Sequence, residues 1–200
     1  MHPNQAFRSA TDKQNLQFAQ DRSFGTLCVN GEAGPVLAHV PFRIADDGQS
    51  IEAHLVRSNP MLELLTAPVV LAVTGADGYI SPDWYGADDQ VPTWNYVAVH
   101  IRGTLVRLAD EELAGILERL STSMEERLNK PIWTMDKVDD DKLRSMMRQI
   151  VPIRLDIESI DGTWKLSQNK PEDVRLGAAS HIDNSFGSEV HELKEHMRHP

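Results

Sequence analysis

The chain contains 200 residues with a formal net charge of −10 at neutral pH, and 40% of the residues are hydrophobic and 25% charged. This composition is typical of one soluble globular domain, with or without an appendage. The negative charge argues against direct DNA binding, because a nucleic-acid surface depends on clustered Lys and Arg. The single cysteine, Cys28, excludes an internal disulfide and is typical of a reducing compartment.

The sequence carries no signal for a membrane or for secretion. No apolar run approaches the roughly 20 residues that a membrane span requires. Residues 1–14 have neither a basic start nor an apolar core, so they do not form a secretory signal. We therefore expect a cytoplasmic protein without membrane contact.

Short strands joined by tight turns are predicted for most of the first half of the chain. Thr11 and Gln14 form a capping-box pattern that predicts a helix over residues 12–22. Pro41 places the second strand at an edge or a bulge, and Gly103 indicates a bulge or a close approach in the fifth. Cys28 in the first strand is expected in the core. The predicted strands cover residues 24–29, 36–44, 50–55, 69–74 and 97–106.

Two helices and a hairpin are predicted for the second half. Apolar residues at helical spacing predict a helix from Asp110 to just before Pro131. A second helix over residues 140–149 is expected to pack into the core. Asp161 and Gly162 are expected to form the tight turn of a hairpin. Because no helix follows each strand, we predict a mainly β protein with flanking helices, of the α+β class.

A candidate phosphate site lies in the sequence HLVRSNP, at residues 54–60. Asn59 and Pro60 form a favourable N-cap and first-turn pair for a short helix. His54 and Arg57 stand just before this helix start, and helix N-termini attract anions through free N–H groups. The alternative reading is a capped surface helix with a solvated Arg57.

The most aromatic stretch, YISPDWYGADDQVPTWNY, spans residues 79–96 and holds two of the four Trp and all three Tyr. Its Pro, Gly and Asp residues exclude a long helix or an unbroken central strand. Aromatic rings with polar tips suit a surface that is half apolar and half wet. We interpret the stretch as a strand end, a shaped loop and a strand start that line a pocket. A rigid surface loop pinned by its own aromatic rings is the alternative.

The last predicted strand runs into the sequence KLSQNK, at residues 165–170, which gathers side chains that can form hydrogen bonds. A binding role and a polar exit loop are both open at this point. The tail that follows has weak apolar periodicity and is expected to be a solvated helix or a frayed end. Its sequence HELKEH, at residues 191–196, is one residue too long for the zinc helix His-Glu-x-x-His. A zinc protease is therefore rejected, and no metal site is expected.

Several nucleotide and redox motifs are absent from the sequence. There is no G-x-G-x-x-G after a strand, no P-loop, no G-x-S-x-G and no C-x-x-C pair. These absences argue against a nicotinamide-binding Rossmann fold, a nucleotide hydrolase and a thiol-redox enzyme.

Four blocks in order, HLVRSNP, YISPDWY, VPTWNY and WKLSQNK, closely resemble the PaiB-type FMN-binding family. This family is a branch of the FMN-binding split-barrel proteins, related to pyridoxamine phosphate oxidases. The resemblance spans about residues 3–176. It implies a six-stranded antiparallel split barrel with flanking helices, working as a homodimer with FMN bound between the subunits. Residues 1–176 would form this domain, and residues 177–200 a C-terminal tail that is helical or disordered.

The resemblance also implies which residues hold FMN. The HLVRSNP segment would bind the phosphate, the second strand would run under the flavin ring, and the aromatic stretch would shape the rest of the pocket. Lys165, Gln168 and Asn169 would reach the cofactor or a substrate above it. The complete expected set is His39, Val40, Pro41, Phe42, His54, Arg57, Ser58, Asn59, Tyr79, Ser81, Trp94, Asn95, Tyr96, Lys165, Gln168 and Asn169.

Three functions follow from this resemblance. Family members are described as negative transcriptional regulators of sporulation and degradative-enzyme genes, so a regulator acting with a flavin cofactor is the first. Because no helix-turn-helix is evident, such regulation would act through a partner or a small-molecule ligand. The alternative is an FMN-dependent oxidoreductase acting on a small substrate, for which no catalytic residue is assigned. A haem-binding relative, which would need a His ligand, is the least favoured.

Overall fold

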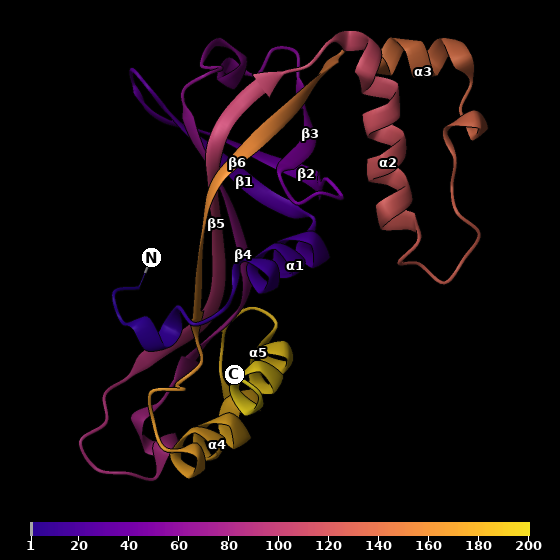
Figure 1. The fold of residues 1–200 in the computed structure, drawn as a ribbon. Coiled ribbons are helices and arrows are strands. Elements are labelled where there is room, and N and C mark those ends of the chain that lie inside the picture. The colour runs from indigo at the N-terminus through magenta and orange to yellow at the C-terminus, as the bar shows by residue number, and fades with distance from the viewer. Residues whose placement is uncertain (1) are drawn as a thin grey trace. The chain divides into compact units, whose positions relative to one another are not determined.

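Six strands form one antiparallel sheet that closes into a barrel in the order β1-β2-β3-β6-β5-β4 (Figure 1). This arrangement comes from a computed structural model that describes residues 2–200. The predicted α+β class and six-stranded antiparallel barrel are confirmed. The strands are β1 (Phe24–Gly31), β2 (Gly34–Ile44), β3 (Ser50–Val56), β4 (Pro68–Ile80), β5 (Thr93–Arg107) and β6 (Ile150–Lys165).

One α-helix precedes the six strands, two lie between β5 and β6, and two follow β6. Within residues 2–200, none of them is long and apolar enough to cross a membrane. They are α1 (Asp12–Arg22), α2 (Leu113–Glu125), α3 (Asp140–Met147), α4 (Glu172–His181) and α5 (Val190–Arg198).

The chain divides into two compact units, which we call the barrel unit and the terminal unit. The barrel unit comprises residues 16–72 and 101–160, and the terminal unit comprises residues 2–15, 73–100 and 161–200. Each of β4, β5 and β6 contributes residues to both units.

Side chains fill the interior of the barrel. Buried residues alternate along β1 and β3, and along β2 from Ala38 onward, as expected for strands with one face toward a core. Phe42, Leu71 and Ile153 are among the largest fully buried side chains. The void left between them is about 10 Å³, close to the smallest volume that holds one water. A cofactor of this protein must therefore bind outside the barrel.

The start of α1 confirms the predicted capping box. The Thr11 hydroxyl accepts a hydrogen bond from the Gln14 backbone N–H at 3.2 Å. The Gln14 side-chain oxygen accepts one from the Thr11 backbone N–H at 2.8 Å. These two bonds satisfy donors that a helix start leaves free.

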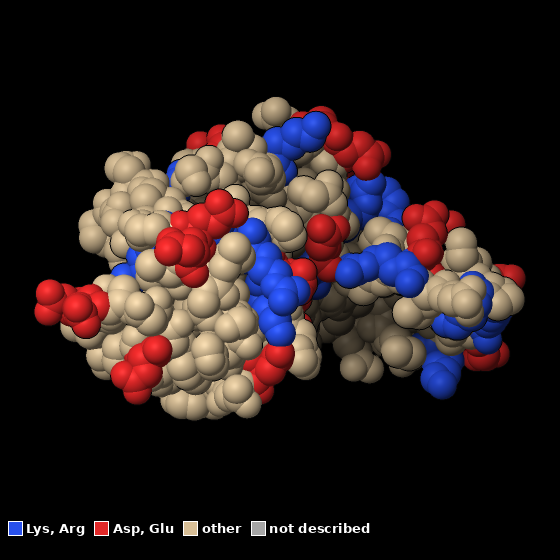
Figure 2. Space-filling model, turned by 90° about the horizontal axis from the view of Figure 1, so that it is seen from below, with Lys and Arg blue, Asp and Glu red and all other residues tan. Residues whose placement is uncertain are grey.

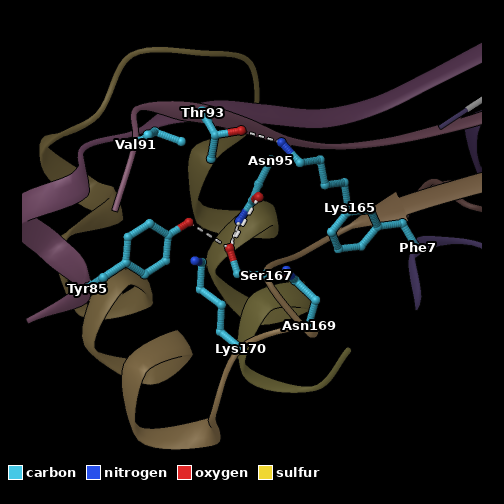
Figure 3. A pocket seen from close by; sticks show the side chains of 9 residues that line it. All are labelled: Phe7, Tyr85, Val91, Thr93, Asn95, Lys165, Ser167, Asn169 and Lys170. Carbon is cyan, nitrogen blue, oxygen red and sulfur yellow. Dashed lines mark hydrogen bonds between the residues drawn. The ribbon is translucent and has the colours of Figure 1, made fainter. Parts of the chain in front are cut away.

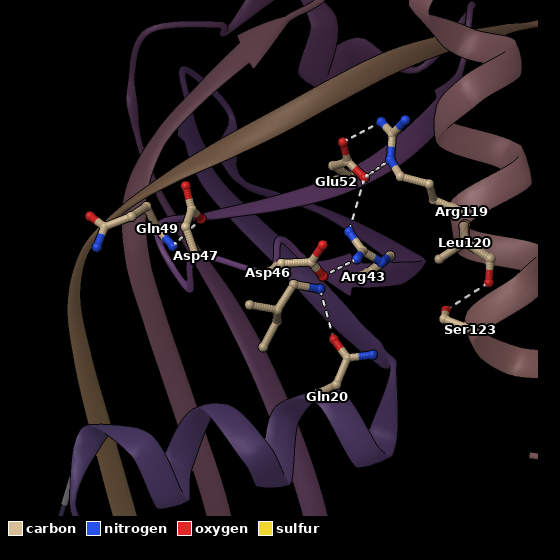
Figure 4. A network of polar contacts seen from close by, with 10 residues as sticks. Gln20, Arg43, Asp46, Asp47, Gln49, Glu52, Arg119, Leu120 and Ser123 are labelled. Atoms are coloured by element: carbon tan, nitrogen blue, oxygen red, sulfur yellow. Dashed lines mark hydrogen bonds and ion pairs between the residues drawn. The ribbon is translucent and has the colours of Figure 1, made fainter.

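Charged contacts join α2 to strand β3 (Figure 4). The Arg119 guanidinium donates to Glu52 of β3 at 3.0 Å through Nε. Arg43 of β2 lies 3.7 Å from the same carboxylate and also pairs with Asp46. Three apolar residues of α2 are buried: Leu113, Ile116 and Leu120.

Both predicted helices after β5 differ from the structure. The first begins as a 3-10 turn at Asp110–Glu112 and α2 ends at Glu125, so Leu128 lies beyond it and is exposed. The expectation that residues 140–149 pack into the core is wrong, because α3 has no buried residue. Leu143 and Met147 of this helix are only half-buried, and Met146 is exposed.

The hairpin predicted at Asp161 and Gly162 is also wrong, because both residues lie within the single strand β6. A two-residue hairpin turn requires a positive φ at its glycine, and Gly162 does not have one. A Cβ at Gly162 would overlap the Asn15 side chain, which accepts a hydrogen bond from Trp164 Nε1 at 2.9 Å. Gly162 therefore allows α1 to approach β6 closely.

The tail is folded, against the expectation of a solvated or frayed end. Leu193 and Met197 of α5 are 0% exposed, and Leu193 lies against Gly78 of β4. The Arg175 guanidinium of α4 donates to the backbone carbonyls of Met197 and, at 3.1 Å, Arg198. Leu176, the last residue of the predicted barrel domain, lies inside α4.

Cys28 was expected in the core, but the structure does not place it there. It is half-buried on β1, between the buried neighbours Leu27 and Val29. Because successive side chains of a strand point to opposite faces, Cys28 faces the outside of the barrel.

We predict that Gly103→Ala destabilises the protein by about 1–3 kcal/mol, the usual cost of overpacking. A Cβ there would overlap the Asp156 backbone carbonyl of β6, which confirms the predicted close approach. The matched control is Gly115→Ala in α2, where a Cβ meets only the flexible end of Arg119. The control should be neutral or stabilising by up to about 1 kcal/mol. Urea unfolding measures both variants, and equal midpoints would contradict the prediction.

Candidate functional site

The barrel unit has an open strand edge at β2. The ladder between β2 and β3 is short, joining Phe42–Ile44 to Ile51–Ala53. The Phe42 backbone N–H donates to Ser23 on the other side, and backbone groups in an antiparallel ladder alternate between sides. The backbone of His39 therefore points toward β3, where the described residues provide no strand partner. Pro41, which has no N–H, lies where the ladder ends, as its type predicts.

The four predicted residues of β2 do not share one face. Val40 is 2% exposed and Phe42 is 0% exposed, so both side chains point into the core. His39 and Pro41 point outward, and the His39 ring lies 6.4 Å from the ring of Phe24 at 25°. A ligand on this strand can contact the side chains of His39 and Pro41, but only the backbone of Val40 and Phe42.

The outer face around His39 is apolar. Three large apolar side chains, one each on β1, β2 and β3, are more than half exposed: Phe24, Leu37 and Val56. Sequence reasoning did not select these residues, although their outward positions follow from the period of the strands. An apolar surface of this kind suits the face of a flat aromatic ligand.

His54 of β3 offers a hydrogen-bonding atom without a partner. Its Nδ1 is buried and has no hydrogen-bond partner among the described residues. Burial lowers the pKa of the His54 imidazole, so the ring is held neutral. A buried polar atom without a partner is unfavourable, and a bound ligand could supply the missing bond.

Arg57 is engaged with the protein. Its Nη2 donates to Asp110 at 3.0 Å and to the Ile150 carbonyl at 3.1 Å, and its Nε donates to the Arg148 carbonyl at 3.0 Å. The hydrogen bonds from Arg57 and Arg107 hold the pKa of the Asp110 carboxyl below its usual range. A hollow of about 300 Å³ adjoins Arg57 and is lined by Arg57, Asp110, Leu113, Arg144, Met147 and Arg148.

The residues after Arg57 form a capped turn. The Asn59 side chain accepts a hydrogen bond from the Met61 N–H at 2.9 Å, which confirms Asn59 as an N-cap. The helix it caps is a 3-10 turn, Pro60–Glu63, and is shorter than predicted. Ser58 is exposed at the surface.

An aromatic cluster lies in the terminal unit. The Tyr79 ring stacks on Phe186 with centroids 5.3 Å apart and planes at 10°. Trp94 stands perpendicular to Phe186, with centroids 5.5 Å apart and planes at 81°. Sequence reasoning placed Tyr79 and Trp94 together but missed Phe186, because the tail that carries it gave no pattern.

A pocket of about 160 Å³ lies in the terminal unit (Figure 3). Lys165 Nζ donates to the Thr93 hydroxyl and, at 2.6 Å, to the Trp94 carbonyl. Burial and, to a lesser degree, the charge of Lys170 lower the pKa of the Lys165 ammonium. The lining residues are Phe7, Tyr85, Val91, Thr93, Asn95, Lys165, Ser167, Asn169 and Lys170.

Ser167 is at the centre of the polar contacts in this pocket (Figure 3). Its hydroxyl lies 2.9 Å from the Tyr85 hydroxyl and accepts a hydrogen bond from Asn95 Nδ2 at 2.9 Å. Burial raises the pKa of the Tyr85 phenol. The site prediction included Asn95 but not Tyr85, Ser167 or Lys170, although KLSQNK contains the last two.

The remaining predicted residues have local roles. The Gln168 amide accepts from the Leu166 N–H at 2.8 Å and donates to the Trp164 carbonyl. Ser81 is the N-cap residue of a 3-10 turn without a side-chain cap bond, and Tyr96 is half-buried in β5. Each unit thus gathers its own half of the predicted set. The barrel unit holds His39, Val40, Pro41, Phe42, His54, Arg57, Ser58 and Asn59, and the terminal unit holds the others.

The sequence matches a known family and a curated relative. The family model described as "Putative FMN-binding domain" matches residues 1–159. The chain is 31% identical over 196 residues to "Protease synthase and sporulation protein PAI 2" of Bacillus subtilis (strain 168), covering 96% of this chain and 93% of the relative. It is also 32% identical over 105 residues to an uncharacterized protein of Saccharomyces cerevisiae, covering 47% and 62% of the two chains.

Solved structures share the fold at low sequence identity. The FAD and heme binding protein from Mycobacterium smegmatis superposes with a TM-score of 0.58 and 16% identity, covering 80% of this chain and 73% of the other. The flavocytochrome Anf3 from Azotobacter vinelandii gives a TM-score of 0.56 and 14% identity, with 78% and 68% covered. These similarities confirm the split-barrel fold.

We predict that His54 makes stability depend on pH. Its pKa is lowered from 6.5 in the folded protein, so the unfolded chain binds the proton first as the pH falls below about 6.5. The free energy of unfolding should therefore decrease from pH 7.5 to pH 5.5, and His54→Asn should make this decrease smaller. Urea unfolding at the two pH values tests this, and an equal decrease in both proteins would contradict it.

Proposed function

We propose a flavin-dependent regulatory role for this chain, which belongs to the family of the FMN-binding domain and has FMN as its cofactor. The observation that supports a flavin site most directly is the outer face of the barrel unit. This face combines an open strand edge at β2 with exposed apolar side chains. The neighbouring strand β3 carries the buried Nδ1 of His54, which has no partner among the described residues.

The residues of the barrel unit fit the chemical parts of FMN. The flat ring requires an apolar surface with a few hydrogen-bonding groups at its edge, which His39, Pro41 and His54 would provide. The phosphate requires a charged donor such as the guanidinium of Arg57, with the free hydroxyl of Ser58 beside it. When bound, FMN would supply reversible hydride and electron transfer.

The eight predicted residues of the terminal unit remain a prediction from the family resemblance. The homodimer is likewise proposed from that resemblance. The exposed side chains of Phe24, Leu37 and Val56 support it, because large apolar patches on a protein surface commonly mark interfaces.

Regulation is the role that we infer for the flavin. The Bacillus subtilis relative carries protease synthesis and sporulation in its name, and the match extends over nearly the whole of both chains. The net charge of −10 argues against direct DNA contact. On the face drawn in Figure 2, Lys and Arg are interspersed with Asp and Glu instead of forming a basic stripe. We therefore propose that the protein regulates through a partner or a small molecule.

We predict that the purified protein has a visible flavin absorption band that dithionite bleaches and NADPH does not. This outcome is expected of a flavoprotein that lacks a nicotinamide site. Absorption spectra before and after each reductant provide the test. Bleaching by NADPH would favour the alternative of an FMN-dependent oxidoreductase. A colourless protein that takes up no added FMN would contradict the flavin site, and a Soret band would indicate haem.

We predict that Arg57→Ala weakens FMN binding about tenfold to a hundredfold, because a charge-assisted hydrogen bond is worth about 1.5–3 kcal/mol. FMN titration of the apoprotein measures the change. Arg119→Ala, which removes another ion-paired Arg of the barrel unit, should leave the affinity unchanged.

A second variant separates binding from structure. Asp110→Asn removes the carboxylate that competes with a phosphate for Arg57, so its FMN affinity should equal or exceed that of the wild type. If Asp110→Asn weakened binding as much as Arg57→Ala, Arg57 would act only by holding the fold.

A further inference from the structure

We propose that the pocket of the terminal unit drawn in Figure 3 binds a small organic carboxylate between Lys165 and Lys170. We call it the two-lysine pocket. All of its lining residues belong to the terminal unit, so the site is complete within that unit. The inference goes beyond the flavin contacts proposed for the barrel unit. It assigns Asn95, Lys165 and Asn169, which the family resemblance gave to the cofactor or a substrate above it, to a separate anion site.

The two lysines are the first reason to expect an anion. No described residue pairs a carboxylate with either ammonium group, and their partners are neutral oxygens and one aromatic ring. Other lysines without a described carboxylate partner, such as Lys13 and Lys142, are exposed to water, whereas Lys165 and Lys170 are half-buried. Two ammonium groups that share one small pocket repel each other, and a bound anion would remove that repulsion.

Both lysines retain donors for a ligand. An ammonium group has three N–H bonds. Lys165 uses two of them, on the Thr93 hydroxyl and the Trp94 carbonyl. Lys170 donates to the Gln90 side chain and lies 4.4 Å from the centre of the Tyr85 ring. Each lysine therefore retains at least one N–H for a bound anion.

The floor of the pocket is held rigidly. Ser167 has a left-handed backbone with φ of 63°, a conformation that residues other than glycine keep only where their surroundings enforce it. Its hydroxyl is fixed by Tyr85 and Asn95, and both Ser167 and Asn95 are almost fully buried. Residues with a strained backbone of this kind concentrate at ligand sites. Ser167 lies between Lys165 and Lys170 in the chain, so its conformation helps to place both lysines.

Size and lining indicate the class of anion. The volume of about 160 Å³ equals that of roughly five water molecules in the liquid. Drug-sized ligands and cofactors occupy about 300–1,000 Å³, so a whole FMN molecule does not fit. The rings of Phe7 and Tyr85 and the methyl groups of Val91 give the pocket apolar walls. A carboxylate with a small apolar or aromatic remainder satisfies both the lysines and the walls.

Benzoate is the probe that tests this assignment. Calorimetric titration of the full-length protein at low ionic strength should show benzoate binding. Lys170→Gln and Lys165→Gln should each weaken it about tenfold to a hundredfold, the effect of one charge-assisted hydrogen bond. Lys142→Gln removes the same charge from the exposed surface of α3 and should leave it unchanged. Lys165 also forms hydrogen bonds with Thr93 and Trp94, so Lys165→Gln could fail to fold. In that case Lys170→Gln alone tests the proposal.

Four results would overturn the proposal. The first is that the wild type binds no benzoate at millimolar concentration, and the second is that Lys170→Gln and Lys142→Gln bind benzoate with equal affinity. The third is that inorganic phosphate binds more tightly than benzoate. The fourth is that Lys170→Gln loses FMN binding and benzoate binding in parallel. The last would make the pocket part of the flavin site. Arg57→Ala distinguishes the two proposals, since it should weaken FMN and leave benzoate binding intact.

Discussion

The filled interior of the barrel is the constraint on which the functional surfaces depend. Closing six strands directs every second side chain inward, and these side chains leave only about 10 Å³ between them. Ligand chemistry is thereby restricted to the outward positions and the strand edges. On β2 this separates neighbours in the sequence, because Val40 and Phe42 complete the core while His39 and Pro41 face outward. The same alternation directs His54 out of the barrel, where its buried Nδ1 has no partner among the described residues.

Arg57 of the barrel unit and the two lysines of the terminal unit differ in the partners with which a bound anion would compete. The planar fork of Arg57 is already occupied by Asp110 and two backbone carbonyls, so a phosphate there must share the guanidinium with a carboxylate. Among the described residues, Lys165 and Lys170 make hydrogen bonds only to neutral groups and keep N–H bonds available. Both lysines are half-buried in one pocket, whereas Lys13 and Lys142, which also form no ion pair with a described carboxylate, are exposed to water. A small anion would compensate the two charges that the pocket brings together.

Local chemistry predicted the features that depend on neighbours in the sequence. The strand periods, the Thr11–Gln14 capping box, the Asn59 cap and the close approach at Gly103 all follow from side-chain type and spacing. The errors occur where distant segments decide. Asp161-Gly162 carries the composition of a turn but stays in β6, because Asn15 of α1 occupies the space over Gly162. Phe186 joins an aromatic cluster through a tail that has no periodicity of its own.

The three strands shared by the two units have a consequence for expressing parts of this protein. The terminal unit is assembled from three separate stretches of chain, so no single cut releases either unit whole. A fragment limited to the family match, residues 1–159, would end β6 before its last six residues and would lack α4 and α5. Such a fragment would leave Gly78 and its neighbours on β4 without the α5 side chains that cover them. A fragment whose ends are chosen from the family match alone would thus expose an apolar surface and would be prone to aggregation.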